Sequence, residues 1–309
     1  MTQLAPIIMF VYSRPDLTQN TLNSLAQNKE AQNSDLFIFA DGPKSTASDI
    51  QKENINKVRT LIAQQTGFKS VTIKAAEKNM GLANSVIAGV TEIVNKYGKA
   101  IIVEDDVSLS PYFLKFMNDA LNLYEFDGKV SGIGSWNYFF LPPENSDNFF
   151  LRHPDTIAWA TFKRAWDKFN PDADFLIREI KKKGLTKAFN MENSIDLMKM
   201  LQRQKEGKVD SWAVRWTASV FLQNMLTLYP QRSLSRHEGH TEGTHFSSDE
   251  LSYDKSLELA QEPLKIKKNQ AIETPEAVNA YIRFHKKHHS LLNKIMAKLK
   301  NLNLTFKMH

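Results

Sequence analysis

The sequence predicts an α/β fold with a mainly parallel sheet flanked by helices. Short, continuous apolar runs alternate with longer segments in which apolar residues recur at helical spacing. A continuous apolar run is typical of a strand buried on both faces, as in parallel sheets. Regular alternation of strands and helices is the pattern of α/β proteins.

The composition is that of a globular protein, with 309 residues, 42% of them hydrophobic and 24% charged. This length suffices for one large domain or two smaller ones. The first apolar run is short and has no basic segment before it, so we expect a strand and not a signal peptide. No apolar run approaches the roughly 20 residues that span a bilayer. The absence of cysteine excludes disulfides and thiolate sites, and it fits a reducing cytoplasm.

The first half alternates strand and helix in a regular order. We expect strands at 7–11, 36–40, around 71–73 and at 100–103, with helices at 13–28, 48–65 and 81–98. Gly98 is expected to end the third helix. Ser110 is expected to cap the next helix, with Pro111 at its first position. Its buried face would consist of Phe113, Phe116, Met117, Ala120, Leu121 and Tyr124.

The alternation breaks down in the second half. The segment 129–140 begins as a strand, and irregular structure follows from about Leu141. We expect a lysine-rich helical stretch at 174–204, then a helix followed by a strand at 210–230. The polar segment 231–248 contains glycines and is expected to be a loop. Both halves are expected to share one sheet and one cleft.

Three adjacent carboxylates, Glu104, Asp105 and Asp106, follow the apolar run at 100–103. Open α/β sheets bind ligands beyond the carboxyl ends of their strands. A divalent cation, which takes oxygen ligands, would hold these carboxylates together. Mg²⁺ or Mn²⁺ would also bridge phosphate oxygens and stabilise a leaving diphosphate. A solvated turn is the alternative, but the position between a buried strand and a helix favours a metal site.

Two further strand ends carry polar residues. Arg14 follows the first strand, and its guanidinium could grip a nucleotide or phosphate. Asp41 ends the second strand before a Gly-Pro turn. Each has an ordinary alternative, a surface arginine and a turn-forming aspartate. Together with the acidic triplet they predict a nucleotide site with a metal. Because neither a P-loop nor a dinucleotide fingerprint occurs, a P-loop kinase and a dehydrogenase are disfavoured.

Five segments resemble GT-A-fold glycosyltransferases of the N-acetylglucosaminyltransferase I type and related bacterial sugar transferases. They are IIMFVYSRPDLTQNTLNSL, FIFADG, NMGLANSV, AIIVEDDVSLSPYFLKFM and VSGIGSWNYF, in this order. The resemblance covers the first half and continues more loosely to about His245. It implies a Rossmann-like GT-A fold with a nucleotide-sugar-binding half (1–140) and an acceptor-side half (141–260). It also implies a nucleotide-sugar donor, UDP-linked, with Mn²⁺ or Mg²⁺. The remaining residues, 261–309, are expected to form a basic amphipathic helical tail.

The resemblance also implies roles for single residues on the donor side. Asp106 would be the direct metal ligand, and Glu104 and Asp105 would contact the ribose and sugar of the donor. Asp41 would match the carboxylate that reads the uracil. Arg14 would match the arginine near the nucleotide.

On the acceptor side the likeness concerns tryptophans. Trp136 and Asn137 match a Trp-Asn pair of the family, and Trp159 would lie beside the acceptor cleft. Trp212, which follows an aspartate at short distance, is assigned to the same side.

The catalytic base is the remaining role. The family has aspartates just before a tryptophan, and Asp210 is the best match, although an alternative register places Arg215 and Trp216 there. An inverting transfer needs such a carboxylate to deprotonate the acceptor hydroxyl. Asp210 could instead cap the helix that follows, or do both.

The polar segment contains His237, His240 and His245 with two glycines. Such a loop could close over a diphosphate as a lid. His245 is expected to touch the metal or the phosphates, although a lone loop histidine is more often solvent-exposed.

The tail is basic, with seven Lys or Arg and no acid from 281 to 309, while the other 33 basic and 34 acidic residues nearly balance. Its apolar face consists of Leu291, Leu292, Ile295, Met296 and Leu299. A basic amphipathic helix is expected to bind an anionic membrane surface. The equally supported alternative packs the apolar face on the body of the protein. A neutral body argues against nucleic acid as a partner.

These features predict a metal-dependent inverting glycosyltransferase, a hexosyl- or N-acetylhexosaminyltransferase of bacterial surface polysaccharide synthesis. Its acceptor would be a glycan or a lipid-linked hydroxyl, and its place the cytoplasm or the inner face of the cell membrane. A nucleotidyltransferase uses similar carboxylates, but its Gly-rich N-terminal loop is absent here. A non-catalytic basic-tailed binding protein is the other alternative, against which the intact triplet, Asp41 and Arg14 argue.

Overall fold

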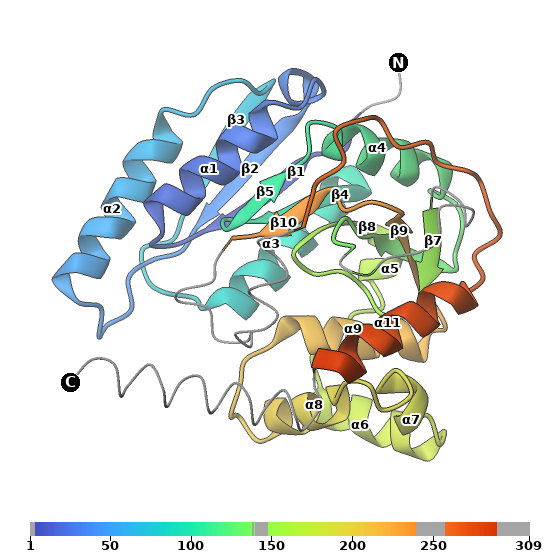
Figure 1. Ribbon diagram of the computed structural model, residues 1–309. Helices are drawn as coiled ribbons and strands as arrows, with labels where there is room; N and C mark the ends of the chain where they lie inside the picture. Colours follow the sequence, from blue (N-terminus) through green and yellow to red (C-terminus); the bar gives the residue numbers. More distant parts are fainter. Residues whose placement is uncertain (1–3, 138, 140–147, 239–256, 289–309) are drawn as a thin grey trace, which may run out of the picture.

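The computed structural model describes residues 4–137, 139, 148–238 and 257–288, which form an α/β architecture around one large sheet (Figure 1). Within these residues the sheet has eight strands in the order β3-β2-β1-β4-β8-β6-β9-β7. They are β1 (Ile7–Val11), β2 (Asp35–Ala40), β3 (Ser70–Ala75), β4 (Lys99–Glu104), β6 (Val130–Ile133), β7 (Asn148–Leu151), β8 (Ala158–Phe162) and β9 (Leu226–Pro230). A separate two-stranded ribbon pairs β5 (Val107–Leu109) with β10 (Ser235–His237).

The sheet is mainly parallel, as predicted. Strands β1 to β4 pair in parallel, and β9 pairs in parallel with β6. Only β8 and β7 run antiparallel to their neighbours in the described sheet. The parallel strands are apolar runs because both of their faces are covered, and all five residues of β1 are buried.

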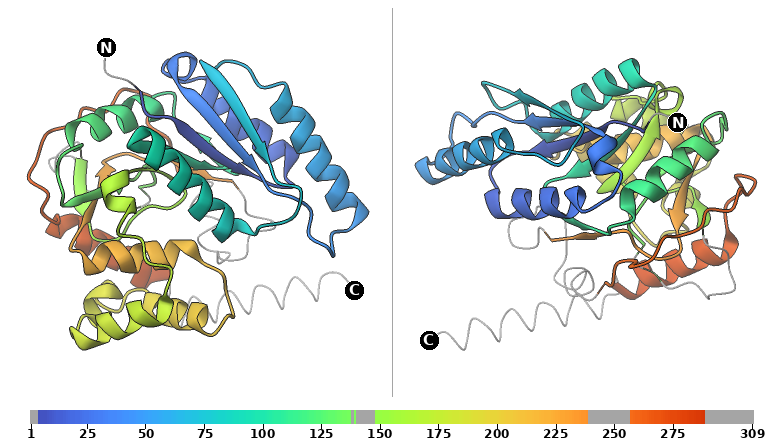
Figure 2. Two further views of the ribbon diagram at one scale, coloured as in Figure 1. Left: turned by 180° about the vertical axis from the view of Figure 1, so that it is seen from behind. Right: turned by 90° about the horizontal axis from the view of Figure 1, so that it is seen from above.

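Helices cover both faces of this sheet. The early ones are α1 (Pro15–Ala26), α2 (Asp49–Ala63), α3 (Leu82–Tyr97) and α4 (Phe113–Leu123). Helices α1 and α2 lie side by side on one face and α3 lies on the other, as right-handed crossovers require (Figure 2). The six apolar residues expected to form the buried face of α4 are all buried, which confirms that prediction.

The second half adds β6 to β9 and a group of short helices to the same sheet. The helices are α5 (Lys163–Trp166), α6 (Ala173–Lys182), α7 (Thr186–Phe189), α8 (Leu197–Lys205) and α9 (Trp212–Leu222). Both halves therefore share one sheet, because β8 pairs with β4 and with β6. The boundaries at residues 140 and 260 stay a prediction.

Three local predictions are wrong. Helix α4 begins at Phe113 with Tyr112 at its N-cap, so Ser110 is not the cap and Pro111 is not the first helical residue. The Ser110 hydroxyl accepts the Tyr112 N–H at 3.1 Å and donates to the Ala260 carbonyl at 2.6 Å, which places it in the turn before the helix. The expected helical stretch 174–204 is broken twice, first at Gly184, whose φ is +68°. The second break comprises three successive residues with positive φ, Met191, Glu192 and Asn193.

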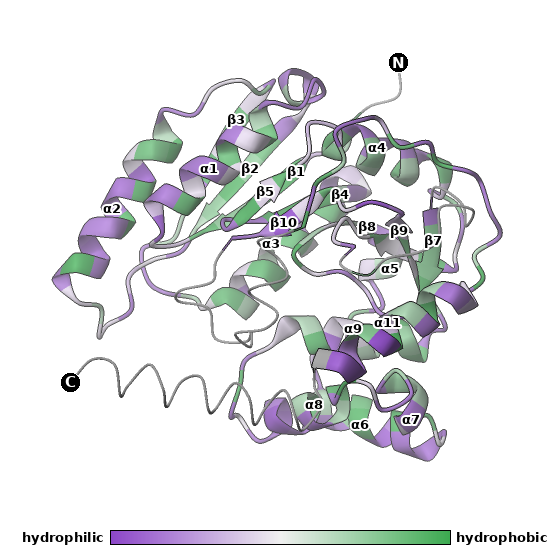
Figure 3. Cartoon of the chain, viewed as in Figure 1, coloured by the Kyte–Doolittle hydropathy of each residue, from purple (hydrophilic) through white to green (hydrophobic). Residues whose placement is uncertain are grey.

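The C-terminal part crosses the molecule before it ends in a helix. Residues 257–274 run without regular structure past α4 and β7 to α11 (Pro275–His288), as Figure 1 shows. In Figure 3, α11 displays alternating hydrophobic and hydrophilic residues. Its buried Ala277, Ala280 and Tyr281 join a cluster with Phe149 and Tyr229. The apolar face expected at 291–299 lies outside the described residues. In the described part, no helix combines the length and the apolar character that crossing a membrane requires.

Candidate functional site

The predicted strand-end residues meet because β1 and β4 are neighbours in the sheet, with Phe10 opposite Glu104. The Arg14 guanidinium forms ion pairs with both Asp105 and Asp106. Its bond to Asp106 Oδ2 measures 2.6 Å. The arginine after the first strand and the acidic triplet after the fourth thus form one charged cluster.

A histidine completes this cluster from a distant part of the sequence. The ribbon between β5 and β10 sets His237 opposite Val107, the residue after Asp106. His237 Nε2 lies 3.2 Å from Asp106 Oδ2, and the N–H of Glu238 donates to the Asp106 carbonyl at 2.7 Å. The prediction that residues 231–248 form a loop is therefore wrong at 235–237. The sequence offered three histidines there, and it gave no sign that His237 was the one to be held by a strand.

Burial and neighbouring charges shift the pKa values of the carboxylates in this cluster. Burial raises the pKa of Glu104 well above its usual value, and the negative charges of Asp106 and Asp105 add to the effect. Burial also raises the pKa of Asp105 to about 6, although Arg14 opposes the shift. Burial acts in the same sense on Asp106, but the hydrogen bond and charge of His237, together with Arg14, hold its pKa below the usual value. Three carboxylates packed this closely favour an additional cation.

The donor set fits a divalent metal. One ligand atom each from Glu104, Asp106 and His237 lie within 4.8 Å of one another. Asp106 Oδ1 is buried and has no hydrogen-bond partner among the described residues. A buried polar atom without a partner is costly, so a ligand that satisfies it is expected. Carboxylate oxygen and imidazole nitrogen suit Mn²⁺ and related ions, and carboxylates suit Mg²⁺.

Asp41 follows β2, and its carboxylate accepts hydrogen bonds from the turn that precedes α3. Its Oδ1 accepts the backbone N–H groups of Gly42 and Met80, both at 2.8 Å. Its Oδ2 accepts the Asn79 side-chain amide at 2.9 Å and the Gly81 N–H at 3.0 Å. The carboxylate therefore organises the residues at 79–81.

Asp155 is a further buried carboxylate that the sequence reasoning missed. It accepts the N–H groups of Ser135 and Trp136 at 2.8 and 2.9 Å and that of Ile157 at 3.0 Å. Burial raises its pKa, although these backbone hydrogen bonds oppose the shift. It fixes the Ser-Trp-Asn segment to the chain that enters β8. A single aspartate in an irregular stretch carries no sequence signal for such a role.

The predicted acceptor-side residues are largely buried. Trp159 is 2% exposed, and its ring stacks on Trp212 with centroids 5.4 Å apart. The Asn137 amide donates to the carbonyls of Pro230 and Gln231, which ties β6 to the end of β9. Trp136 is partly exposed. Trp159 and Trp212 thus pack in the core, and Asn137 fixes a turn. The acceptor-side role of these residues and of Trp136 stays a prediction.

Asp210 is exposed and forms an ion pair with Arg215 at 2.9 Å. Ser211, not Asp210, caps α9, because its hydroxyl accepts the Val214 N–H. The alternative that Asp210 caps this helix is therefore wrong. Its role as catalytic base stays a prediction. His240 and His245, and the lid predicted around them, lie outside the described residues.

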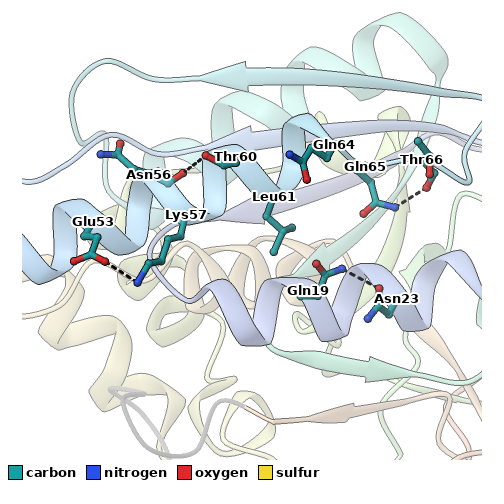
Figure 4. A pocket seen from close by; sticks show the side chains of 10 residues that line it. All are labelled: Gln19, Asn23, Glu53, Asn56, Lys57, Thr60, Leu61, Gln64, Gln65 and Thr66. Atoms are coloured by element: carbon teal, nitrogen blue, oxygen red, sulfur yellow. Dashed lines mark hydrogen bonds and ion pairs between the residues drawn. The ribbon is translucent and has the colours of Figure 1, made fainter.

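A polar pocket of about 690 Å³ lies between α1 and α2 (Figure 4). Its lining residues are Gln19, Asn23, Glu53, Asn56, Lys57, Thr60, Leu61, Gln64, Gln65 and Thr66. Several of them bond to each other, as Gln19 does to Asn23. The pocket contains none of the predicted site residues.

Comparison with known proteins points to one group of enzymes. The GNT-I family matches residues 1–140. The alpha-1,3-mannosyl-glycoprotein 2-beta-N-acetylglucosaminyltransferase of Arabidopsis thaliana is 21% identical over 184 residues, which cover 54% of this chain. The match spans 39% of that relative's length. The resemblance to the N-acetylglucosaminyltransferase I type is thus confirmed for the first 140 residues.

Two solved structures of S. aureus TarS were also found as similar. One is 12% identical with a TM-score of 0.35, and covers 52% of this chain and 28% of that chain. The other, of TarS residues 1–349, is 12% identical with a TM-score of 0.34, and covers 52% of this chain and 47% of that chain.

Proposed function

We propose that this protein is a glycosyltransferase that moves a sugar from a nucleotide-diphosphate donor to a hydroxyl group of a glycan or lipid-linked acceptor. The observation that carries the proposal is the cluster of Arg14, Glu104, Asp105 and Asp106 at the carboxyl ends of β1 and β4. These residues fall inside the segment that matches the GNT-I family. The likeness to the family suggests the class of reaction, and the cluster provides side chains that could bind a divalent cation and a diphosphate.

Asp106, with Glu104 and His237, would hold a divalent cation, Mn²⁺ or Mg²⁺. When bound, such a cation neutralises charge on a departing diphosphate. Arg14 and His237 both contact Oδ2 of Asp106, at 2.6 and 3.2 Å, and so fix the orientation of this carboxylate. Two fixed partners leave Asp106 Oδ1 as the atom directed at the ligand.

We further propose a UDP-linked donor and inversion at the sugar carbon, with Asp210 as the base. Asp210 is exposed, so an acceptor hydroxyl could reach its carboxylate. Membrane association through the basic tail and a role in surface polysaccharide synthesis belong to the same proposal.

The test is calorimetry of the full chain with UDP, with and without Mn²⁺. We expect UDP to bind only with the metal, and Asp106→Asn to weaken binding by about 100-fold or more, as for loss of a charge-bearing ligand. Asp119→Asn is the control, because Asp119 is half-exposed and pairs with Lys115 on the surface of α4. If UDP does not bind in the presence of Mn²⁺, or if Asp106→Asn binds UDP normally, the proposal is refuted.

A further inference from the structure

We propose that helix α1 positions the metal-binding carboxylate Asp106 through a hydroxyl stripe on the face that packs against β5, and that Thr21 is the central positioning residue. The stripe consists of Thr18, Thr21 and Ser24, which follow one another at intervals of three residues and are therefore neighbours on one helix face. The inference rests on the proposed function, because it takes Asp106 as a ligand of a divalent cation. It concerns residues that would act on this ligand through the backbone beside it.

The first argument is that Thr21 satisfies both backbone groups of the residue after Asp106. In an antiparallel ribbon, every second residue directs its N–H and C=O away from the partner strand. Val107 is such a residue, because the neighbouring Asp106 carbonyl is the group that accepts from the Glu238 N–H. The buried Thr21 hydroxyl accepts the Val107 N–H at 3.1 Å and donates to the Val107 carbonyl at 2.9 Å. One side chain thus takes the place of a neighbouring strand at this edge.

The second argument is that the stripe continues on both sides of Thr21. Ser24 Oγ accepts the N–H of Leu109, the next residue of β5 that faces away from β10, at 3.2 Å. Thr18 lies one turn earlier and donates to Oδ2 of Asp105 at 3.5 Å. Figure 1 shows β5 between α1 and β10, so this strand is held along both edges.

The ribbon depends on this second edge because it is small. Each of its strands has three residues, and a lone two-stranded ribbon is only marginally stable. The bonds from α1 therefore fix where β5 lies, and β5 in turn sets His237 opposite Val107. Two members of the candidate metal site, Asp106 and His237, are thus positioned from one helix.

The third argument is that the same helix carries the cation of the charged cluster. Arg14 is the N-cap residue of α1, and its guanidinium pairs with Asp105 and Asp106. Helix α1 therefore contacts the acidic segment twice, through Arg14 at its N-terminus and through the hydroxyl stripe along its length. Because a helix is rigid, these two contacts fix the side chain and the backbone of Asp106 relative to each other. Groups that orient a metal ligand in this way strongly affect metal affinity.

Three threonine variants test the inference. Thr21→Val replaces the hydroxyl by a methyl group of similar size and leaves the N–H and C=O of Val107 without this partner. Thr21→Ser keeps the hydroxyl and removes only a methyl group. Thr217→Val is the matched control, because Thr217 is also buried and its hydroxyl donates to the Ala213 carbonyl within its own helix, α9.

The measurements on the full chain are Mn²⁺ titration followed by electron paramagnetic resonance and hydrogen exchange of the Val107 amide without metal. We expect Thr21→Val to weaken Mn²⁺ binding by about tenfold or more, as is usual when a group that orients a metal ligand is lost. Thr21→Ser should stay within about threefold of the wild type, because its hydroxyl still reaches Val107. Exchange of the Val107 amide should accelerate by about tenfold or more in Thr21→Val. Thr217→Val should match the wild type in both measurements.

Urea unfolding of both valine variants separates a general loss of stability from an effect on the metal. The inference is overturned if folded Thr21→Val binds Mn²⁺ like the wild type, or if Thr21→Ser binds it as weakly as Thr21→Val. If Thr21→Val does not fold, Thr21→Ser and the wild type decide. The inference then stands only if Thr21→Ser keeps its Mn²⁺ affinity and the wild-type Val107 amide is protected from exchange.

The same measurements distinguish this inference from the proposed function. Failure of the wild-type protein to bind Mn²⁺ would refute the proposed metal site itself. An unprotected Val107 amide in a wild-type protein that binds Mn²⁺ would refute only the positioning role of Thr21.

Discussion

Asp106, Asp41 and Asp155 have different roles because their partners differ. Asp106 is bound by Arg14 and His237, and its Oδ1 has no partner among the described residues. The carboxylate oxygens of Asp41 and Asp155 accept hydrogen bonds from backbone N–H groups. Residue type alone therefore does not distinguish a ligand-binding carboxylate from one that fixes a turn. The hydrogen-bond donors around each carboxylate make this distinction.

At this scale we predict that His237→Ala weakens Mn²⁺ binding by at least about tenfold, because a ligand and a brace of Asp106 are lost together. Mn²⁺ titration followed by electron paramagnetic resonance measures the effect without any sugar transfer. His153→Gln is the matched control, since His153 packs against Tyr281 of α11 and does not belong to the charged cluster. Equal Mn²⁺ affinity in His237→Ala and the wild type would remove His237 from the metal site.

A second residue-level prediction concerns pH. Burial lowers the pKa of His153 to about 4 from 6.5. Between about pH 4 and 6.5 the unfolded chain therefore binds a proton at His153 that the folded chain does not bind. The free energy of unfolding is unaffected by this group above about pH 6.5, and it decreases as the pH falls towards 4. We expect the His153 contribution to the free energy of unfolding to fall by about 2 kcal/mol, since the ring keeps some solvent contact. Urea unfolding of wild type and His153→Gln at pH 7 and 4.5 measures it, and identical pH dependence in both would contradict it.

At the scale of elements, short segments decide where the site residues lie. The three-residue strand β10 sets His237 beside Asp106, and the turn before α3 is set by Asp41. Neither segment has the periodicity of a long element. Each is fixed by bonds to a neighbouring strand end rather than by its own sequence.

The element-level prediction is that Asp155→Ala lowers the free energy of unfolding by about 2–4 kcal/mol, because buried N–H groups of Ser135, Trp136 and Ile157 lose their acceptor. Chemical denaturation measures the change. Asp167→Ala removes an exposed aspartate that pairs with Lys163, and should stay within about 0.5 kcal/mol of the wild type. A similarly small effect of Asp155→Ala would show that water replaces the carboxylate.

At the scale of the whole molecule, the C-terminal segment connects α4 to the β7 end of the sheet. Tyr124 of the segment after α4 bonds to Asn269, and Arg152 forms a two-pronged pair with Glu273. Helix α11 then covers the aromatic cluster beside β7. The segment therefore belongs to the folded body up to α11, whatever the residues beyond it do.

The corresponding prediction is that Tyr281→Ala costs about 3–4 kcal/mol of stability in a single cooperative transition, because it empties space inside this cluster. Phe126→Ala is the control for loss of an aromatic ring, since Phe126 is 94% exposed. We expect it to change the free energy of unfolding by less than about 0.5 kcal/mol. A separate early transition in Tyr281→Ala would instead show that α11 unfolds independently.

The sequence by itself determined the regular part of the molecule. Strands β1, β2 and β4 and helices α2 and α3 follow from continuous apolar runs, helical periodicity and the end signal at Gly98. Because the carboxyl ends of parallel strands share one edge, Arg14 and the acidic triplet could be predicted to meet. These inferences use local patterns and one topological rule.

Only the tertiary structure decided which partner each polar group finds. His237 reaches Asp106 across more than a hundred residues, Asp155 binds a segment twenty residues away, and the Asp41 oxygens are taken by a turn after the next strand. A hydrogen bond depends on ångström-scale positions set by packing, and nothing in the local sequence records them. The sequence therefore marked where the site lies, and the fold decided which carboxylate is left with an open oxygen.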